Sequence, residues 1–228
     1  MEINKWAEDL TAEVSRKWKD SANRYEFSAS GFRVFSSPVR PCPDLMVIGY
    51  HPGNEDKPFN RKEDFRIPVR HEYGHDDSKL AKKMQYLFEG IDRDEWLSLC
   101  IKVHLIFFFS DSESQQWESL KKDIRDDLEM FCFRKVNDIV DTVKPRYIVT
   151  EGLNVFDILL DSVLMGCDKP EVKIGVGGRK IYARSRYGHT HIIGLPNLAK
   201  DVISYPDWND VKKYLKLDLK ALEQMGFH

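Results

Sequence analysis

Short apolar runs alternate with longer amphipathic stretches along most of this chain. The apolar runs that predict buried strands are residues 45–49, 101–109, 146–150 and 191–195. The stretches with apolar residues three or four positions apart, which predict helices, are 2–19, 78–91, 114–143, 155–163 and 208–225. Strands separated by helices indicate an α/β protein. We expect a three-layer α/β/α fold around a central, mostly parallel sheet of about four or five strands.

Three smaller features complete this pattern. Residues 32–36 predict a short edge strand, and Ser78 is a plausible N-cap for the helix that follows it. Residues 172–176 and 180–183 flank Gly177-Gly178, which predicts a β-hairpin with a tight two-residue turn. The intervening segment 54–77 is polar and irregular, and a loop of this length in a compact domain is usually functional or mobile.

Composition narrows the class of protein without naming a function. The chain has 228 residues, of which 42% are hydrophobic, and a formal net charge of −2. We expect one domain over residues 1–228, with residues 1–30 as a helical extension packed on it. No apolar run is long enough to predict a membrane span. The balanced charge gives no global case for nucleic-acid binding, but a local basic groove remains possible.

The four cysteines, Cys42, Cys100, Cys132 and Cys167, are widely separated and form no CxxC pair. This spacing disfavours zinc and iron–sulfur sites, and it predicts buried, reduced thiols in a cytoplasmic protein. His71 and His75, with Asp76 and Asp77, would hold a metal only on a helix, and Gly74 between them argues against one. We therefore expect no metal. We also expect no organic cofactor, and we favour a monomer.

Distinctive polar and aromatic residues follow three of the predicted strands. The residues at the three strand ends are Tyr50, His51, Pro52, Gly53, Asn54 and Phe59 after Gly49; Ser110 and Asp111; and Pro196 and Asn197. Parallel strands present their carboxyl ends at one edge of a sheet, where open α/β proteins bind ligands. These residues can therefore converge on one pocket.

The order of these segments resembles the uracil-DNA glycosylase superfamily. The segment Ile48-Gly-Tyr-His-Pro-Gly53 is similar to that superfamily's first motif, a strand ending in Gly-x-(Asp, Asn or Ala)-Pro-Gly. Residues 138–152 resemble its central helix–strand unit, in which Lys-Pro ends a helix and the next strand ends in glycine. Gly194-Leu-Pro-Asn197 resembles its second motif. The resemblance covers roughly residues 40–225 and implies a fold like that of uracil-DNA glycosylases.

The resemblance implies a monofunctional DNA-base glycosylase with DNA as its partner. His51 would position and activate water, Asn197 would donate its amide N–H to the base, and Phe59 would stack on the extruded base. The other residues implied to contact the base are Gly49, Tyr50, Pro52, Gly53, Asn54, Ser110 and Pro196. Arg179, Lys180, Arg184 and Arg186, with Tyr182 and Tyr187 nearby, would hold the nucleic-acid backbone.

Several features of the sequence leave other interpretations open. Leu198-Ala199 follows the second motif where the family has Pro-Ser, and Ser110 stands where many members have an amide that reads the base. The alternative interpretations are simple turn residues for His51 and Asn197, a core-filling side chain for Phe59, and a solvated surface for the basic hairpin. The alternatives to a glycosylase are a non-catalytic module that binds a nucleotide, a nucleic-acid end or a protein, and a different small-molecule hydrolase.

Overall fold

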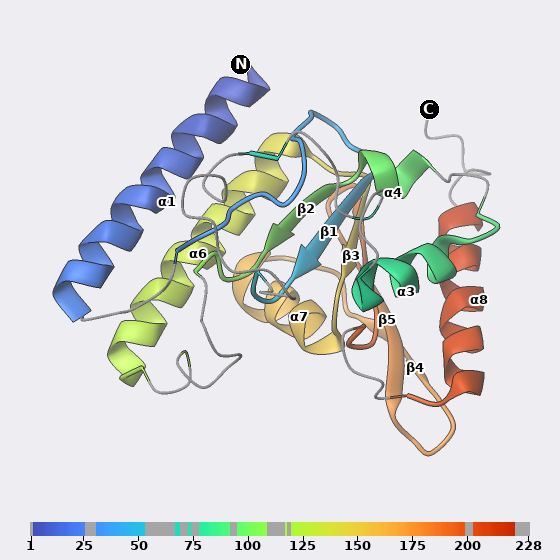
Figure 1. Ribbon diagram of the computed structural model, residues 1–228. Coiled ribbons are helices and arrows are strands. Elements are labelled where there is room, and N and C mark those ends of the chain that lie inside the picture. The colour runs from blue at the N-terminus through green and yellow to red at the C-terminus, as the bar shows by residue number, and fades with distance from the viewer. Residues whose placement is uncertain are drawn as a thin grey trace.

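The computed structural model describes residues 2–25, 31–52, 67–68, 73, 78–91, 95–108, 117, 120–198 and 203–221. The predicted site residues Gly53, Asn54, Phe59 and Ser110 lie outside this part of the chain, as do His71 and His75. The described elements form an α/β structure around one mixed sheet (Figure 1).

Six strands form the sheet, in the order β2-β1-β3-β6-β5-β4. They span Leu45–Gly49 (β1), Ile101–His104 (β2), Tyr147–Thr150 (β3), Glu171–Ile174 (β4), Lys180–Tyr187 (β5) and Thr190–Gly194 (β6). The pairs β1–β2, β1–β3 and β3–β6 are parallel, whereas β5 pairs antiparallel with both β6 and β4. The mostly parallel sheet that the sequence predicts is therefore confirmed, with a two-stranded antiparallel extension at one edge.

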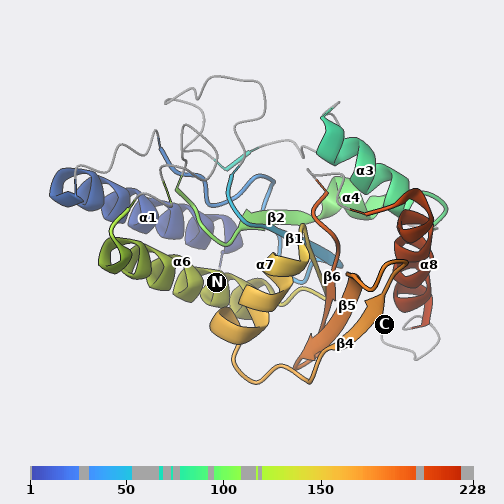
Figure 2. The ribbon, with the colours of Figure 1, turned by 90° about the horizontal axis from the view of Figure 1, so that it is seen from below.

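Helices cover both faces of the sheet. Helices α1 (Ile3–Tyr25), α6 (Lys122–Val143) and α7 (Leu153–Ile158), with a π-helical turn η1 (Leu159–Val163), lie on one face. Helices α3 (Lys79–Phe88), α4 (Glu95–Leu99) and α8 (Tyr205–Ala221) lie on the other, as Figure 2 shows. Side chains alternate between these two cores along β1: Met46 and Ile48 face α1 and α6, whereas Leu45 and Val47 face α3 and α8.

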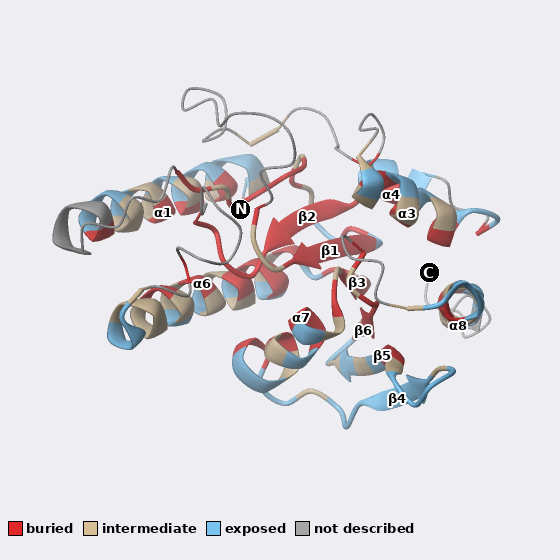
Figure 3. Cartoon of the chain, turned by 60° about the horizontal axis from the view of Figure 1, so that its bottom comes forward, coloured by how far each residue is buried: buried red, intermediate tan, exposed pale blue. Residues whose placement is uncertain are grey.

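Burial falls from the centre of the sheet to one edge. Every residue of β1, β2 and β3 is buried, whereas every residue of β4 is exposed (Figure 3). This gradient explains why near-continuous apolar runs predicted the central strands, because a strand buried on both faces is mostly apolar along its whole length.

The second predicted strand, 101–109, is too long. Strand β2 ends at His104, and the chain then hydrogen-bonds beside the end of β1, from Leu105 N to Gly49 O and from Ile106 N to Tyr50 O. The following Phe107 and Phe108 are both fully buried in the α1–α6 core. Residues 105–108 all pack in this one core instead of alternating between the two faces, so this apolar run contains a strand and a core-filling segment.

Two other strand predictions also need correction. Residues 32–36 form isolated antiparallel bridges, Phe32 with Phe108 and Phe35 with Val103, instead of a strand. The hairpin turn is wider than two residues, because Gly175 N bonds to Arg179 O and the loop runs over 175–179. Asp207 explains the wider loop: its carboxylate accepts a hydrogen bond from Val176 N at 2.8 Å and so ties the loop to α8.

The helix predictions are right in kind but wrong in several boundaries. Helix α1 runs on to Tyr25, α6 begins at Lys122, and α8 begins at Tyr205, where Ser204 caps its first turn. The predicted cap at Ser78 is confirmed, since its hydroxyl accepts from Ala81 N at 3.1 Å. The short α4 carries no distinct periodic signal and was not predicted.

All four cysteines are free, but only Cys100 and Cys132 are buried; Cys42 is exposed and Cys167 is half-buried. The prediction that all four are buried is thus wrong for these two. Among the described helices, none is both long enough and apolar enough to cross a membrane.

Candidate functional site at the carboxyl ends of the central strands

The strand order places a topological switch point between β1 and β3. From β1 the chain passes to β2 on one side, and then returns to β3 on the other side of β1. Open α/β sheets bind ligands in the crevice at such a point, beyond the carboxyl ends of the strands. The residues here are Gly49 to Pro52 after β1 and Glu151 after β3, so the sequence motif at Tyr50–Pro52 lies at the position that this rule selects.

His51 is held in a largely apolar environment beside the end of β1. Its ring lies 5.4 Å from that of Trp117 and 4.5 Å from that of Tyr50, both edge-on. Burial lowers the pKa of His51 to about 4, although a hydrogen bond to the Phe108 backbone opposes this effect. His51 is therefore a neutral imidazole at pH 7.

One ring nitrogen of His51 remains available. Nδ1 is buried and has no hydrogen-bond partner among the described residues. A neutral imidazole that donates one N–H to a carbonyl presents its other nitrogen as an acceptor. His51 can therefore accept a proton at Nδ1, as the water-positioning role requires.

A buried ion pair, which was not predicted, lies beside the motif. Lys102 Nζ on β2 is 3.2 Å from Glu151 Oε1, and the two side chains are only 2% and 8% exposed. The Tyr73 hydroxyl donates a hydrogen bond to the same carboxylate oxygen, and Lys102 Nζ lies 4.8 Å from the centre of the Tyr73 ring. The carboxylate thus has two donors on Oε1, which fix its orientation.

Gly49 leaves the space that this arrangement needs. A Cβ atom at position 49 would lie 2.7 Å from Glu151 Oε2 and 2.9 Å from His104 Nδ1. His104 is buried, and its Nε2 lies 3.1 Å from the Ser36 hydroxyl, whereas Nδ1 has no partner among the described residues. Burial lowers the pKa of His104 well below its usual value, and Lys102 and Arg33 add to this effect. Neutral His104 and charged Glu151 therefore flank the end of β1.

One sequence signal could have identified these residues. Lys102 and His104 are the two polar residues that interrupt an otherwise apolar run, and a charged group inside a doubly buried strand needs a buried partner. Glu151 looks like an ordinary turn residue before Gly152, and its pairing across the sheet leaves no local mark in the sequence.

The second motif lies one strand farther along the same edge. β6 ends at Gly194 beside Thr150 of β3, and Leu195 N bonds to Thr150 O. Pro196 is buried and Asn197 is half-buried. Because neighbouring strands are about 4.8 Å apart, the ends of β1 and β6 are separated by roughly 10 Å. The structure thus brings Gly49, Tyr50, His51, Pro52, Pro196 and Asn197 to one edge of the sheet.

The four predicted backbone-binding cations are not gathered at that edge. β5 runs antiparallel to β6, so Lys180 lies toward the carboxyl end of β6, whereas Arg186 pairs with His191 near its start. Three of the cations form ion pairs: Lys180 with Asp157 at 2.6 Å, Arg184 with Glu171 and Asp218 at 2.6 Å each, and Arg186 with Asp168 at 3.3 Å. Arg179 is exposed in the hairpin loop.

Within the described part of the chain, no three His, Cys, Asp or Glu side chains are grouped so that they could hold a metal ion. No model of a known protein family matches this sequence, and no curated protein matches it significantly. The fold and the site therefore define an α/β protein with a histidine and a buried ion pair at its switch point, and its function must be argued from these residues.

Proposed function

We propose that this protein binds an extruded nucleobase at the carboxyl ends of β1, β3 and β6 and hydrolyses its N-glycosidic bond, as a DNA-base glycosylase of the uracil type. The observation that carries the proposal is His51: a neutral imidazole whose Nδ1 has no hydrogen-bond partner among the described residues, at the end of the strand beside the switch point. The resemblance of residues 48–53 and 194–197 to two glycosylase motifs supports it.

In the proposed reaction, water attacks the sugar carbon C1′ while His51 Nδ1 takes a proton from that water. The C1′–N bond breaks, and its electron pair leaves with the base. Asn197 donates its amide N–H to a base carbonyl, where negative charge grows. The proton on His51 then passes to the departing base nitrogen, which leaves a C1′ hydroxyl and a neutral base. No step requires a metal or a redox cofactor.

A cleavage assay tests this reaction directly. Single- and double-stranded oligonucleotides that contain uracil, hypoxanthine or xanthine would be incubated with the protein and then treated with alkali. We expect strand scission with the wild type and a loss of at least 100-fold with His51→Ala, which is the usual contribution of a general base. His189→Ala is the matched control, because His189 is exposed in the β5–β6 turn.

The pH profile, measured over the range in which the protein stays folded, provides a second readout. Because the pKa of His51 is about 4, its base form predominates down to that pH. We therefore expect the rate to fall on the acid side near pH 4 instead of near pH 6.5. Absence of scission with all three bases at every pH would contradict the proposal.

One observation favours a second candidate, a module that binds a nucleotide without cleaving it. The predicted backbone-binding cations Lys180, Arg184 and Arg186 are engaged with carboxylates, so the hairpin offers little charge to a polymer. Calorimetric titration with uracil, UMP and an abasic oligonucleotide separates the candidates. Binding of the small ligands without cleavage of any oligonucleotide would support the module.

A further inference from the structure

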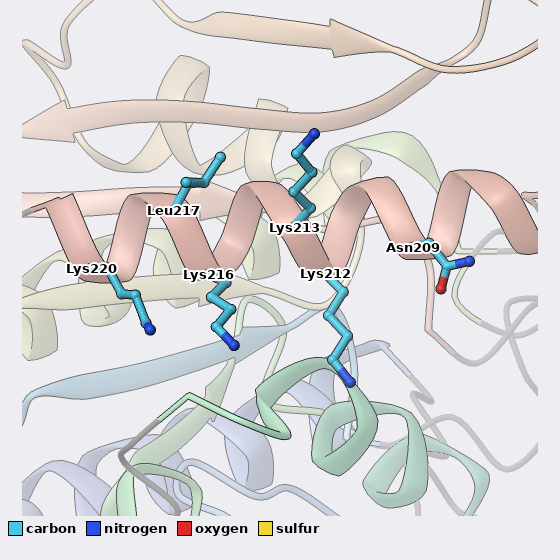
Figure 4. A pocket seen from close by; sticks show the side chains of 6 residues that line it. All are labelled: Asn209, Lys212, Lys213, Lys216, Leu217 and Lys220. Carbon is cyan, nitrogen blue, oxygen red and sulfur yellow. The ribbon is translucent and has the colours of Figure 1, made fainter.

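A surface rich in lysine covers the outer sides of α3 and α8. We call it the α3–α8 lysine surface, and its members are Lys79, Lys82, Lys83, Lys212, Lys213, Lys216 and Lys220. The two helices contact one another, and Tyr86 of α3 donates a hydrogen bond to Asn209 of α8 at 2.8 Å. A shallow hollow on α8 is lined by Asn209, Lys212, Lys213, Lys216, Leu217 and Lys220 (Figure 4).

Three of these lysines, Lys213, Lys216 and Lys220, form no ion pair within the described part of the chain. The nearby Lys212 is paired with Glu89 at 2.7 Å and lies 4.2 Å from the centre of the Tyr86 ring. This surface therefore differs from the β4–β5 hairpin, whose Lys180, Arg184 and Arg186 are ion-paired.

Two of the three aspartates of α8 are engaged away from its lysines. Asp207 accepts hydrogen bonds from Val176 N and the Ser204 hydroxyl, and Asp218 accepts from Tyr182 and Arg184. Asp210, the third aspartate, is a single half-buried carboxylate against the four lysines of the helix. In a chain of net charge −2, positive charge is concentrated on one helix pair.

We propose that the α3–α8 lysine surface binds the phosphate backbone of a nucleic acid. The choice of a nucleic acid as the polyanion rests on the proposed function, whereas the location and charge of the surface do not. The inference moves backbone binding from the hairpin, where the sequence predicted it, to α8.

The spacing of the lysines fits a polymer of phosphates. Lys213, Lys216 and Lys220 lie three and four residues apart, so they form a row about 10 Å long on one side of the helix. A nucleic-acid strand carries one charge about every 3.4 Å, and this row therefore faces about three phosphates.

The type of side chain also favours a phosphate backbone over an acidic protein. α3 and α8 contain no arginine. Lysine is a mobile point charge, which suits contacts that do not depend on sequence, whereas planar carboxylate recognition usually employs the arginine fork. The row of lysines is therefore suited to sequence-independent contact with a backbone.

A triple variant tests the surface on the full chain. The probes are fluorescent 30-nucleotide DNAs, single- and double-stranded, without any damaged base, so that binding is measured apart from cleavage. For Lys213→Gln/Lys216→Gln/Lys220→Gln we expect binding at least 10-fold weaker at about 100 mM salt. The slope of log affinity against log salt should fall by about 2 to 3, because each phosphate contact contributes about 0.7 to 0.9.

The control is Lys19→Gln/Lys121→Gln/Lys169→Gln, which removes the same charge from exposed positions elsewhere. Its affinity and salt slope should stay close to the wild-type values. Equal losses in both triple variants, no loss in the α8 variant, or no DNA binding by the wild type would overturn the proposal. Wild-type binding to anionic vesicles but not to DNA would also overturn it.

Failure of this inference is distinguishable from failure of the proposed function. If the wild type binds undamaged DNA but cleaves no damaged base, the proposed glycosylase activity is rejected, whereas the proposal for the lysine surface stands. Cleavage of a damaged base by the wild type, together with unchanged DNA binding by the α8 triple variant, would support the glycosylase and reject the lysine surface.

Discussion

Lys102 and Glu151 form an ion pair of 3.2 Å across the sheet, from β2 to the end of β3, with β1 between them. Both side chains are almost fully buried, and Tyr73 adds a hydrogen bond to the carboxylate. Buried charges are costly to desolvate, so each partner depends on the other for its place in the interior. This pair therefore joins three strands at the point where the candidate site lies.

We expect either single substitution, Lys102→Met or Glu151→Gln, to lower the free energy of unfolding by about 3–5 kcal/mol at pH 7, because each leaves a buried charge without its opposite charge. The double variant Lys102→Met/Glu151→Gln should lose less than the sum of the two. Urea unfolding of the four proteins measures this coupling.

The exposed pair Lys180–Asp157, at 2.6 Å, is the matched control. Its double-mutant cycle should give a coupling of less than about 1 kcal/mol, since solvent screens both charges. A coupling for Lys102–Glu151 as small as that of the control would contradict the importance of the buried pair.

Gly49 is required at the end of β1 because of the side chains beside it. In Gly49→Ala the new Cβ would lie 2.7 Å from Glu151 Oε2 and 2.9 Å from His104 Nδ1, closer than real Cβ contacts. We expect a loss of about 1–3 kcal/mol in unfolding free energy, as for other overpacked sites. Thermal unfolding provides the measurement.

The same substitution in a Glu151→Ala background tests the cause. The carboxylate is the nearest atom to the new methyl group, so its removal should reduce the cost of Gly49→Ala. An unchanged cost would mean that the crowding arises elsewhere.

The sequence predicted the central strands and most helices because their burial leaves a local pattern. β1 is correct at both ends, since Asp44 precedes its apolar run and Gly49 ends it. β2 was overextended because Phe107 and Phe108 are as apolar as a strand, yet they fill the core beside Phe32. Hydrophobicity alone records burial, and it does not distinguish a strand from a core-filling loop.

The candidate site was only half predictable for a similar reason. His51 and Asn197 come within three residues of the ends of β1 and β6. The rule that ligands bind beyond the carboxyl ends of parallel strands therefore identifies both. The contacts of Glu151 with Lys102 and of His51 with Trp117 join residues 49 and 66 positions apart in the sequence, and no local pattern encodes them. The only local sign was Lys102 and His104 inside an apolar run.

The pKa of His51 makes stability depend on pH. Since the folded state holds it near 4 and an unfolded histidine titrates near 6.5, the unfolded chain binds a proton that the folded chain does not between these values. Stability from this residue is therefore complete above about pH 6.5 and falls as pH decreases toward 4. The loss amounts to at most about 3 kcal/mol.

The measurement is the free energy of unfolding at pH 7.5 and pH 4.5 for the wild type and for His51→Gln. The lowered pKa of His104 costs both proteins stability at acid pH. The wild type should therefore lose more unfolding free energy than the variant, and the difference between the two losses belongs to His51. Parallel pH curves for the two proteins would show that the imidazole is solvated instead of buried.

Lys144 ends α6 in the left-handed conformation, with φ 51° and ψ 62°, and its N–H bonds to Val140 O at 2.9 Å. A Cβ atom makes this conformation costly, whereas glycine adopts it freely. We expect Lys144→Gly to raise the free energy of unfolding by about 0.5–1 kcal/mol. Lys144→Ala separates this backbone effect from the loss of a positive charge at the helix end, because alanine removes the charge but keeps Cβ. In denaturant unfolding, only the glycine variant should be more stable than the wild type. Equal stability of the two variants would show that the Cβ atom at position 144 costs nothing.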